Sequence, residues 1–376
     1  MAHSRSPGIF RRFALGVLTA LAGRPPQGAG IANGEVRRIL VVELWNLGDV
    51  VLLLPFLSQL REIFPSARVT LLAKPHAREL LGETGLVDEF LDDAAPSGNW
   101  LSLNPLVGGW GDLWELRARL RSRRFDIAFQ CRLHVREHVI LAMSGARRRV
   151  GYAFGEGDTM LTDAVPVGDP HRHKVADWMG LLEVFGGHVA TGYQQLAVPE
   201  TSRAAAGKFL ADSAILPGDL VVGIHPGASV AEKRWPLKSF AEVAASIAER
   251  PGVRVVMFAD PGGYGESLGD IEGVALARTS LRDLIALIDR CDVLVCNDSG
   301  PMHIAGALGV TAAAIFSSGV ARWFAPLGDS HELITADEGG ISSIPVQRVV
   351  DAVDRVLFVR RARDISMPSI QPLSPS

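Results

Sequence analysis

Short apolar runs alternate with longer amphipathic stretches along most of the chain, and the alternation occurs in two sets. The first set predicts strands at residues 39–44, 68–73 and 126–130 and helices at 54–63 and 113–121. The second predicts strands at residues 221–225, 253–258, 274–276, 293–296 and 312–316, and helices at 237–249, 281–288 and 302–308. This pattern is typical of βα units in a parallel sheet, so the sequence predicts an α/β protein with two Rossmann-like halves.

A chain of 376 residues is long enough for two domains of this kind, each with its own core. We expect an apolar leader and linker at 1–35, an N-terminal domain at 36–197, a C-terminal domain at 198–345, and a terminal helix with a tail at 346–376.

The predicted strand at 293–296 ends abruptly in Asn297-Asp298-Ser299-Gly300-Pro301, and a helix of small residues follows. Pro301 suits the first turn of a helix, and Ser299 suits the cap before it. Free N–H groups at such a helix start attract phosphate. His303 falls on the first turn, and Asp298 lies at the carboxyl end of the strand, where open α/β sheets bind ligands. The alternative interpretation is an ordinary strand-to-helix turn.

This junction resembles the Asp-(Ser/Thr)-Gly-Pro-x-His motif in the donor site of the ADP-heptose:lipopolysaccharide heptosyltransferases, glycosyltransferase family 9. Residues 39–51, which contain Gly48-Asp49, are similar to the family's first strand and Gly-Asp loop. Residues 223–229, followed by Lys233-Arg-Trp-Pro236, are similar to the start of its second domain. The resemblance runs from about residue 36 to 357. It implies a GT-B fold, with two parallel sheets facing across an interdomain cleft, and an inverting glycosyltransferase that acts on a nucleotide-activated sugar.

Asp49 is the predicted catalytic base. It follows a strand and a glycine, so its carboxylate should project from the carboxyl edge of the sheet. Position alone favours a cap for the helix at 50–63. The resemblance instead implies that Asp49 takes the proton from the acceptor hydroxyl.

The resemblance also implies a donor site in the second domain. The Ser299-Gly300 backbone, His303, Lys233 and Arg234 would stabilise the departing diphosphate without a metal, although the basic pair also fits a plain loop before the next helix. Glu266 is aligned with a glutamate that holds a ribose hydroxyl in similar enzymes. The predicted donor-binding residues are Lys233, Arg234, Glu266, Asp298, Ser299, Gly300 and His303.

Arg132 and His134 follow the predicted strand at 126–130 and are candidates to bind an anionic glycolipid acceptor, although a polar helix start explains His134 equally well. The glycine-rich segment 96–111 is a candidate acceptor-side loop. The basic clusters at 117–124 and 147–149 are expected to be solvated helix faces and ends, with an anionic acceptor or a membrane surface as the alternative partner.

We expect neither a metal nor a cofactor beyond the nucleotide sugar. Asp92-Asp93 is expected to be a solvated pair, and His171 and His173 lack further ligands nearby. Cys131, Cys291 and Cys296 have no metal-ligand spacing and are expected to be core residues. The formal net charge of −3 gives no support for nucleic-acid binding.

The N-terminus carries Arg5, Arg11 and Arg12 before an apolar run at 13–22. The run is shorter than the roughly 20 apolar residues that a membrane span needs, and it ends in a sequence that also resembles a signal-peptidase site. We expect a peripheral helix at the cytoplasmic face of the inner membrane, because nucleotide sugars are made in the cytoplasm.

The sequence departs from the family pattern at Glu43, where many members carry a basic residue, and this leaves the acceptor open. The donor sugar and its base are also not distinguished. A nucleotide-sugar epimerase of similar fold and a non-catalytic nucleotide-sugar sensor remain the alternatives to a transferase that builds lipopolysaccharide or a related cell-surface glycan.

Overall fold

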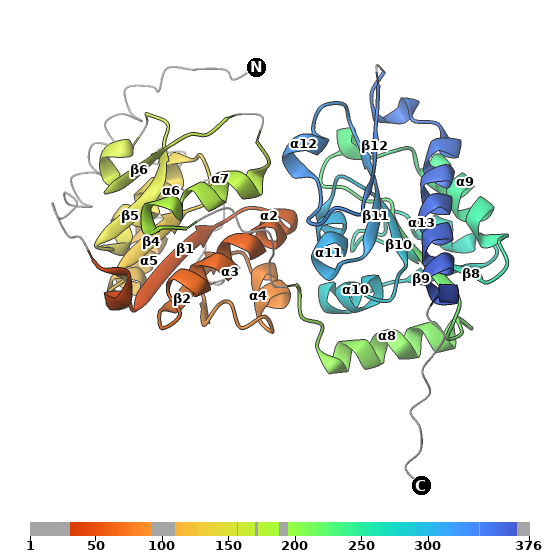
Figure 1. Cartoon of the computed structure of the whole chain (residues 1–376), viewed down its shortest axis with the longest axis horizontal. Coiled ribbons are helices and arrows are strands. Elements are labelled where there is room, and N and C mark those ends of the chain that lie inside the picture. Colours follow the sequence, from red (N-terminus) through yellow and green to blue (C-terminus); the bar gives the residue numbers. More distant parts are fainter. Residues whose placement is uncertain are drawn as a thin grey trace, which may run out of the picture. The chain divides into compact units, whose positions relative to one another are not determined.

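The computed structural model describes residues 31–91, 110–155, 157–169, 172–187, 195–337 and 339–366. The chain divides into two compact units, Met1–Gln194 and Gln195–Ser376, and Figure 1 labels the elements of each. The predicted leader, the pair Asp92-Asp93 and most of segment 96–111 lie outside the described residues. Within those residues, no helix has both the length and the apolar character needed to cross a bilayer.

The first unit contains a six-stranded parallel sheet with the order β3-β2-β1-β4-β5-β6. Its strands are β1 Arg38–Glu43, β2 Arg68–Ala73, β3 Glu89–Phe90, β4 Ile127–Gln130, β5 Arg148–Ala153 and β6 Asp163–Pro166. Its helices are α2 Leu47–Leu52, α3 Leu54–Ile63, α4 His76–Leu81, α5 Trp110–Ser122, α6 Val135–Ser144 and α7 Lys174–Gly180. This is the order of a doubly wound Rossmann-like sheet.

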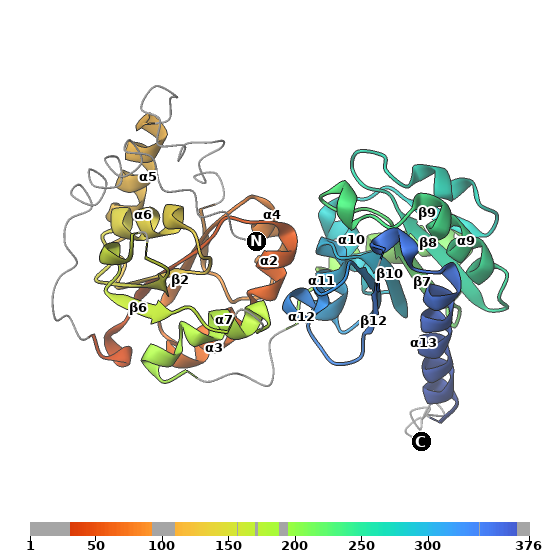
Figure 2. The same cartoon turned by 90° about the horizontal axis from the view of Figure 1, so that it is seen from above.

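Different helices cover the two faces of this sheet (Figure 2). Leu40 and Val42 of β1 join a cluster with Leu116 of α5 and Ile140 of α6. On the other face, the Phe129 ring of β4 meets rings from α3 and from the segment after α7, with the centroid of Phe56 at 5.4 Å. Because alternate strand residues point to opposite faces, both faces of the sheet are buried, as parallel sheets require.

The second unit repeats the architecture, with the strand order β12-β11-β10-β7-β8-β9. Its strands are β7 Leu220–His225, β8 Val253–Phe258, β9 Val274–Ala277, β10 Val293–Asn297, β11 Thr311–Phe316 and β12 Glu332–Thr335. Its helices are α8 Glu200–Asp212, α9 Leu237–Ala248, α10 Leu281–Ile288, α11 Gly300–Leu308, α12 Ala321–Phe324 and α13 Val346–Ser366. The prediction of two Rossmann-like α/β halves is therefore confirmed.

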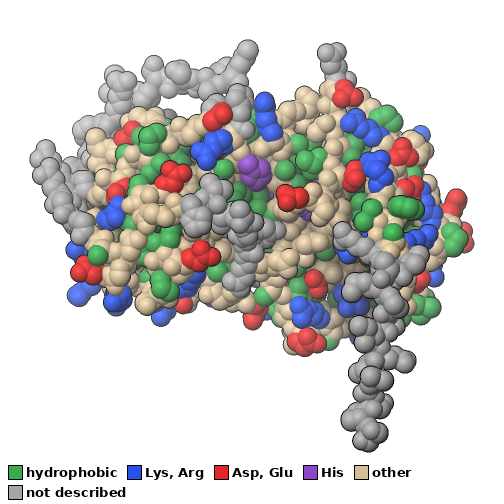
Figure 3. All heavy atoms as spheres, viewed as in Figure 1, with side chains coloured by type: hydrophobic (Ala, Val, Ile, Leu, Met, Phe, Trp, Pro, Cys, Tyr) green, Lys and Arg blue, Asp and Glu red, His purple; other side chains and the backbone are tan. Residues whose placement is uncertain are grey.

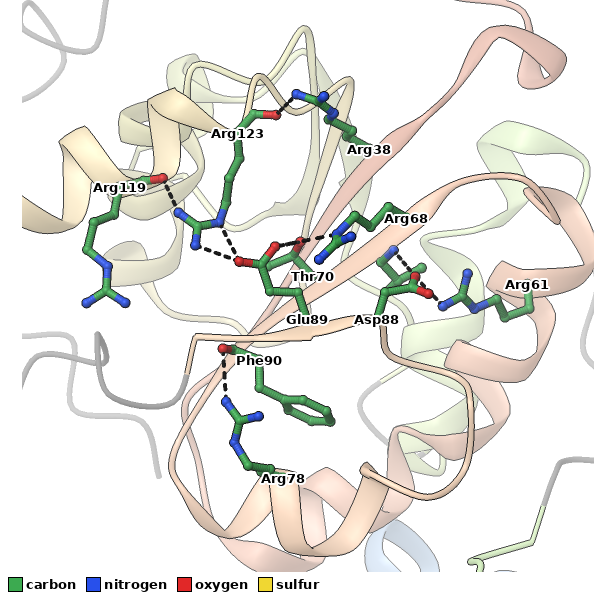
Figure 4. A network of polar contacts seen from close by, with 11 residues as sticks. Arg38, Arg61, Arg68, Thr70, Arg78, Asp88, Glu89, Phe90, Arg119 and Arg123 are labelled. Atoms are coloured by element: carbon green, nitrogen blue, oxygen red, sulfur yellow. Dashed lines mark hydrogen bonds and ion pairs between the residues drawn. The ribbon is translucent and has the colours of Figure 1, made fainter.

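The amino edge of the first sheet is arginine-rich, and two acidic residues organise it (Figure 4). Arg123, just after α5, places Nη2 2.6 Å from Oε1 of Glu89, and Arg61 of α3 places Nη2 2.6 Å from Oδ2 of Asp88. The hydrogen bonds from Arg123 lower the pKa of Glu89. The expectation that the basic cluster at 117–124 is solvated is wrong for Arg123, whose side chain is only 24% exposed. The same expectation for the cluster at 147–149 is wrong for Arg149, which is buried.

Gly223, in the middle of β7, is the place where the second core tolerates no side chain. A Cβ atom there would lie 2.8 Å from the Phe258 ring and 2.9 Å from Sγ of Cys291. Gly207 in α8 is exposed and has no atom within 4 Å of its Cβ position. Gly223 and Gly207 thus allow a crowded and an uncrowded glycine to be compared within one unit.

We predict that Gly223→Ala lowers the free energy of unfolding by about 1–3 kcal/mol through overpacking. Gly207→Ala should instead raise it by about 0.5–1 kcal/mol, because alanine loses less backbone entropy in a helix. Urea unfolding of both variants against the parent protein measures these changes. Equal effects of the two substitutions would contradict the described packing around β7.

Candidate active site

Asp49 lies in the first turn of α2, just beyond the carboxyl end of β1. The helix begins earlier than the sequence suggests: Asn46 is its N-cap, and Asp49 is the third helical residue of a capping box. Oδ2 of Asp49 accepts a hydrogen bond from the Asn46 backbone N–H at 3.2 Å. The capping alternative is therefore correct in part, because Asp49 supports the helix start without being the N-cap.

The other carboxylate oxygen of Asp49 faces Arg132. Nη1 of Arg132 lies 2.8 Å from Oδ1 of Asp49, and the two side chains are 15% and 12% exposed. The guanidinium also lies over the ring of Trp45, with Cζ 4.1 Å from the ring centroid. Arg132 follows β4, which is the neighbour of β1 in the sheet, so parallel pairing brings the ends of the two strands together.

Two buried glutamate side chains complete this cluster. Glu43, the last residue of β1, is fully buried, and its Oε1 accepts a hydrogen bond from the Trp45 backbone N–H at 3.0 Å. Burial raises the pKa of Glu43 to about 8, against the effect of Arg132 and with a smaller contribution from Asp49 in the same direction. Glu137 of α6 accepts a hydrogen bond from the Arg132 backbone N–H at 3.1 Å, and burial raises its pKa well above the ordinary value.

His134 is the N-cap of α6, and its Nδ1 accepts a hydrogen bond from the Arg136 backbone N–H at 3.1 Å. The helix-start interpretation of His134 is confirmed, and this ring nitrogen is engaged within its own helix. His173 caps α7 in the same way, while His171 lies outside the described residues. A role for His134 in acceptor binding stays a prediction.

In the second unit, the predicted anion-binding junction takes the expected form. Ser299 precedes α11 as its N-cap, with Gly300 and Pro301 at the helix start. The Ser299 side chain accepts no capping hydrogen bond, and among the described residues its buried hydroxyl has no hydrogen-bond partner. His303 lies on the first turns of the helix and is only 4% exposed. The backbone N–H groups and the serine hydroxyl are therefore available to a ligand at the helix start.

Lys233 and Asp298 meet beside this helix start. Nζ of Lys233 lies 2.6 Å from Oδ2 of Asp298. Lys233 comes from the turn before α9, and Asp298 directly follows β10. The lysine side chain is 37% exposed and the aspartate only 8%, so the ammonium group is the more accessible partner.

Asn297 fixes the geometry of the loops around the pair, and the sequence prediction gave it no role. Its Oδ1 accepts a hydrogen bond from the Trp235 backbone N–H at 3.0 Å, and its Nδ2 donates to the Pro226 carbonyl at 2.7 Å. Its position in the strand-to-helix junction was a signal for such a role, because a fully buried amide needs partners.

Arg234 contacts a carbonyl group and an aromatic ring. Its guanidinium donates to the Ala228 carbonyl, at 2.9 Å from Nη2, and lies 4.6 Å from the Tyr264 ring centroid. This contact joins the turn before α9 to the loop that carries Glu266. Glu266 itself pairs with Arg278 at 2.8 Å, and the hydrogen bond from Arg278 lowers its pKa.

Asp260 makes close contacts at the base of the loop that carries Glu266. Nε2 of His225, at the end of β7, lies 3.0 Å from Oδ1 of Asp260. A Cβ atom on Gly227 would fall 2.0 Å from Oδ2 of Asp260. A side chain at position 227 would therefore displace the Asp260 carboxylate from its place beside His225.

Among the described residues, no group of three or more histidine, cysteine, aspartate or glutamate side chains has a metal-binding arrangement. Cys131, Cys291 and Cys296 are buried free thiols, as expected. Burial raises the pKa of all three, so they are inert core residues.

Comparison with known proteins agrees with this architecture. The family model for glycosyltransferase family 9 (heptosyltransferase) matches residues 113–347. Lipopolysaccharide heptosyltransferase 2 of Escherichia coli is 26% identical over 371 residues, covering 86% of this chain and 100% of that protein.

Two solved structures share the fold. The glycosyl transferase family 9 protein of Veillonella parvula superposes with a TM-score of 0.75 at 24% identity, covering 86% of this chain and 97% of that chain. The ADP-heptose lps heptosyltransferase II of E. coli superposes with a TM-score of 0.71 at 20% identity, covering 86% and 99%.

Two Rossmann-like units, together with the match to the family model and the shared fold of the solved structures, identify a glycosyltransferase of the GT-B type. The chain belongs to glycosyltransferase family 9, the heptosyltransferase family.

The raised pKa of Glu43 predicts a pH dependence of stability. The folded protein keeps a proton on Glu43 up to about pH 8, whereas the unfolded chain releases it near the ordinary value of 4.5. Stability due to this group is therefore lost as the pH rises from about 4.5 to 8. In Glu43→Gln this loss should disappear, so the variant gains stability relative to the parent as the pH rises.

Urea unfolding at several pH values between 5 and 8 measures this difference. Glu83→Gln is the control, because Glu83 is an exposed residue of the same unit. Parallel stability curves for Glu43→Gln and the parent protein would contradict the buried, protonated state of Glu43.

Proposed function

We propose that this glycosyltransferase moves heptose from an ADP-linked donor to a sugar hydroxyl of the lipopolysaccharide core, with Asp49 as the base. The observation that carries the proposal is the Asp49 carboxylate, which the Arg132 guanidinium holds at 2.8 Å at the carboxyl edge of the first sheet. Family membership supports the reaction class, and the names of the relatives support lipopolysaccharide as the acceptor and ADP-heptose as the donor.

In this proposal the second unit binds the donor diphosphate. The α11 start offers backbone N–H groups and the Ser299 hydroxyl to a diphosphate, and Lys233 is positioned to add a point charge. In the free protein this ammonium group is balanced by Asp298 at 2.6 Å. A diphosphate that reaches Lys233 would share that charge, and its own negative charge would be stabilised as it leaves.

The proposed step is a single inverting displacement. The acceptor oxygen forms a bond to the anomeric carbon of the donor, and its proton passes to Asp49. The bond between that carbon and the phosphate oxygen breaks, and the nucleotide diphosphate leaves with the electron pair. In this proposal the cationic groups of the second unit act in place of a metal, so transfer should continue in the presence of a chelator.

An epimerase is not favoured by the family assignment. A sensor would need no base, and the Asp49 cluster has the composition of a proton-accepting site. The expected cytoplasmic location and the peripheral contact with the inner membrane belong to the proposal as well, since the acceptor is a glycolipid.

Replacing Asp49 tests the base. We predict that Asp49→Asn lowers turnover by about 10²–10⁴-fold, because it removes general-base catalysis, and leaves the ADP affinity unchanged. ADP release in the presence of donor and acceptor measures turnover, and calorimetry measures binding. Asp126→Asn is the matched control, because Asp126 also accepts backbone N–H bonds, at 2.8 and 3.0 Å, but at the amino edge of the sheet. Normal turnover in Asp49→Asn would refute the assignment.

Replacing Lys233 tests the donor half. Loss of one charged contact to the diphosphate should weaken ADP binding about ten- to a hundredfold. Lys238→Ala is the control, because Lys238 is 89% exposed on the neighbouring helix. Titrations with ADP, UDP and GDP, each with and without chelator, test the base preference and the metal independence together. An ADP affinity that is equal in Lys233→Ala and Lys238→Ala would remove Lys233 from the donor site.

A further inference from the structure

Arg132 makes more specific contacts than an acceptor-binding arginine would need. Its guanidinium bonds Asp49 and lies over the Trp45 ring. Its backbone N–H donates to Glu137, and its backbone carbonyl accepts from the side chain of Gln130. Both the main chain and the side chain of Arg132 are therefore fixed before any substrate binds.

Asp49 is the most accessible carboxyl group beside Arg132. Glu43 and Glu137 are buried, and burial raises the pKa of both. Asp49 is the carboxylate of the cluster that keeps contact with solvent. The Arg132 side chain therefore makes its direct contact with the one carboxylate of the cluster that a substrate can reach.

The remaining titratable groups near Asp49 do not replace the charge of Arg132. Lys74, after β2, places Nζ 3.4 Å from Oδ1 of Asn46. Burial and Lys74 lower the pKa of His76 in α4, so His76 is neutral at pH 7. The titratable groups that interact with the Asp49 carboxylate from the surrounding elements are Glu43, His76, Arg132 and Glu137, and Lys74 and Cys131 lie around this cluster.

Hydrogen bonding still leaves Asp49 free to accept a proton. Oδ1 accepts from Arg132 and Oδ2 from the Asn46 backbone. Each carboxylate oxygen has a second lone pair, so an acceptor hydroxyl can bond to either one. Arginine is not deprotonated in proteins, so Arg132 does not compete for the transferred proton as a lysine or histidine would.

We infer that Arg132 is a positioning residue for catalysis, which orients the Asp49 carboxylate through an ion pair, with its guanidinium packed on Trp45. This inference rests on the proposed role of Asp49 as the base, and it assigns Arg132 a task other than the acceptor binding expected from the sequence. Glu43 lies at the end of β1, where many family members carry a basic residue. Here Arg132, which follows the neighbouring strand β4, supplies a positive charge instead.

The test compares pH–rate profiles of the full-length protein with Arg132→Gln, Arg132→Lys and Asp49→Asn, using an ADP-heptose donor and a lipopolysaccharide core acceptor. Arg132→Gln removes the positive charge, so it should shift the acidic limb of the pH profile of kcat upward by about one to three pH units. The loss of rate is then greatest at acid pH, while the acceptor KM and the ADP affinity change little. Arg132→Lys keeps the charge but not the planar fork, so it should restore the limb and only part of the rate.

Arg148→Gln is a closely matched control. Arg148 pairs with Asp163 at 2.5 Å and lies over the Phe185 ring at 4.1 Å, so its loss should cost comparable stability. It lies at the amino end of β5, and its removal should leave the profile unchanged. A merely structural role for Arg132 would make the two glutamine variants behave alike, and that result would overturn the inference.

Two further results would also overturn it. One is a raised acceptor KM in Arg132→Gln with kcat and its acidic limb unchanged, which would make Arg132 an acceptor-binding residue. The other is an acidic limb in Arg132→Lys displaced as far as in Arg132→Gln. If Arg132→Gln does not fold, Arg132→Lys decides: a lowered kcat with the limb in place supports the inference, and a raised KM alone refutes it. Full activity of Asp49→Asn would instead refute the proposed base itself.

Discussion

Parallel strand pairing is the constraint on which both half-sites depend. It brings the carboxyl ends of neighbouring strands to one edge of a sheet, so residues far apart in sequence meet there. In the first unit, β1 pairs with β4, and this register places Arg132 beside Asp49, 83 residues away. In the second unit, β10 pairs with β7, so the Asn297 amide can donate a hydrogen bond to the loop after β7. The order of the strands therefore determines which residues meet, and the chemistry of their side chains acts within that arrangement.

The two half-sites use burial in different ways. In the first, burial raises the pKa of Glu43 and Glu137 beside the Arg132–Asp49 ion pair. In the second, the buried Asn297 has no charge and acts through two hydrogen bonds to backbone groups. The proposed base is thus surrounded by ionisable groups. The proposed donor site depends on backbone geometry around the start of α11.

Local patterns in the sequence were enough for eight strands, the strand-to-helix junction at Asn297–Pro301 and the two-unit architecture, because these depend on apolar periodicity and on turn residues. The strands β3, β5, β6 and β12 escaped prediction. β3 has only two residues, and β6 and β12 are partly exposed. β5 begins with Arg148 and Arg149, which were expected to lie in a solvated basic cluster. The start of α2 was placed too late, because Asn46 and Asp49 form a capping box that spans the glycine between them.

The composition of the site was harder to predict than its location. Asp49 and Asp298 follow predicted strands, so sequence position indicates their edge of the sheet. The ion pairs Arg132–Asp49 and Lys233–Asp298 depend on register and loop path, which no local pattern encodes. The same limit applies to Arg234, whose basic character suggested phosphate but whose side chain braces Tyr264 and a carbonyl group.

The cluster around Glu43 also restricts how the sequence can evolve. Glu43 ends β1, and Arg132 follows the neighbouring strand β4. A basic residue in place of Glu43 would bury a second cation near the guanidinium, where like charges are strongly disfavoured. A direct change to a basic residue at position 43 therefore requires a change of Arg132, whereas a neutral residue does not. The residue types allowed at these two positions depend on each other, so the effect of a substitution at one depends on the residue at the other.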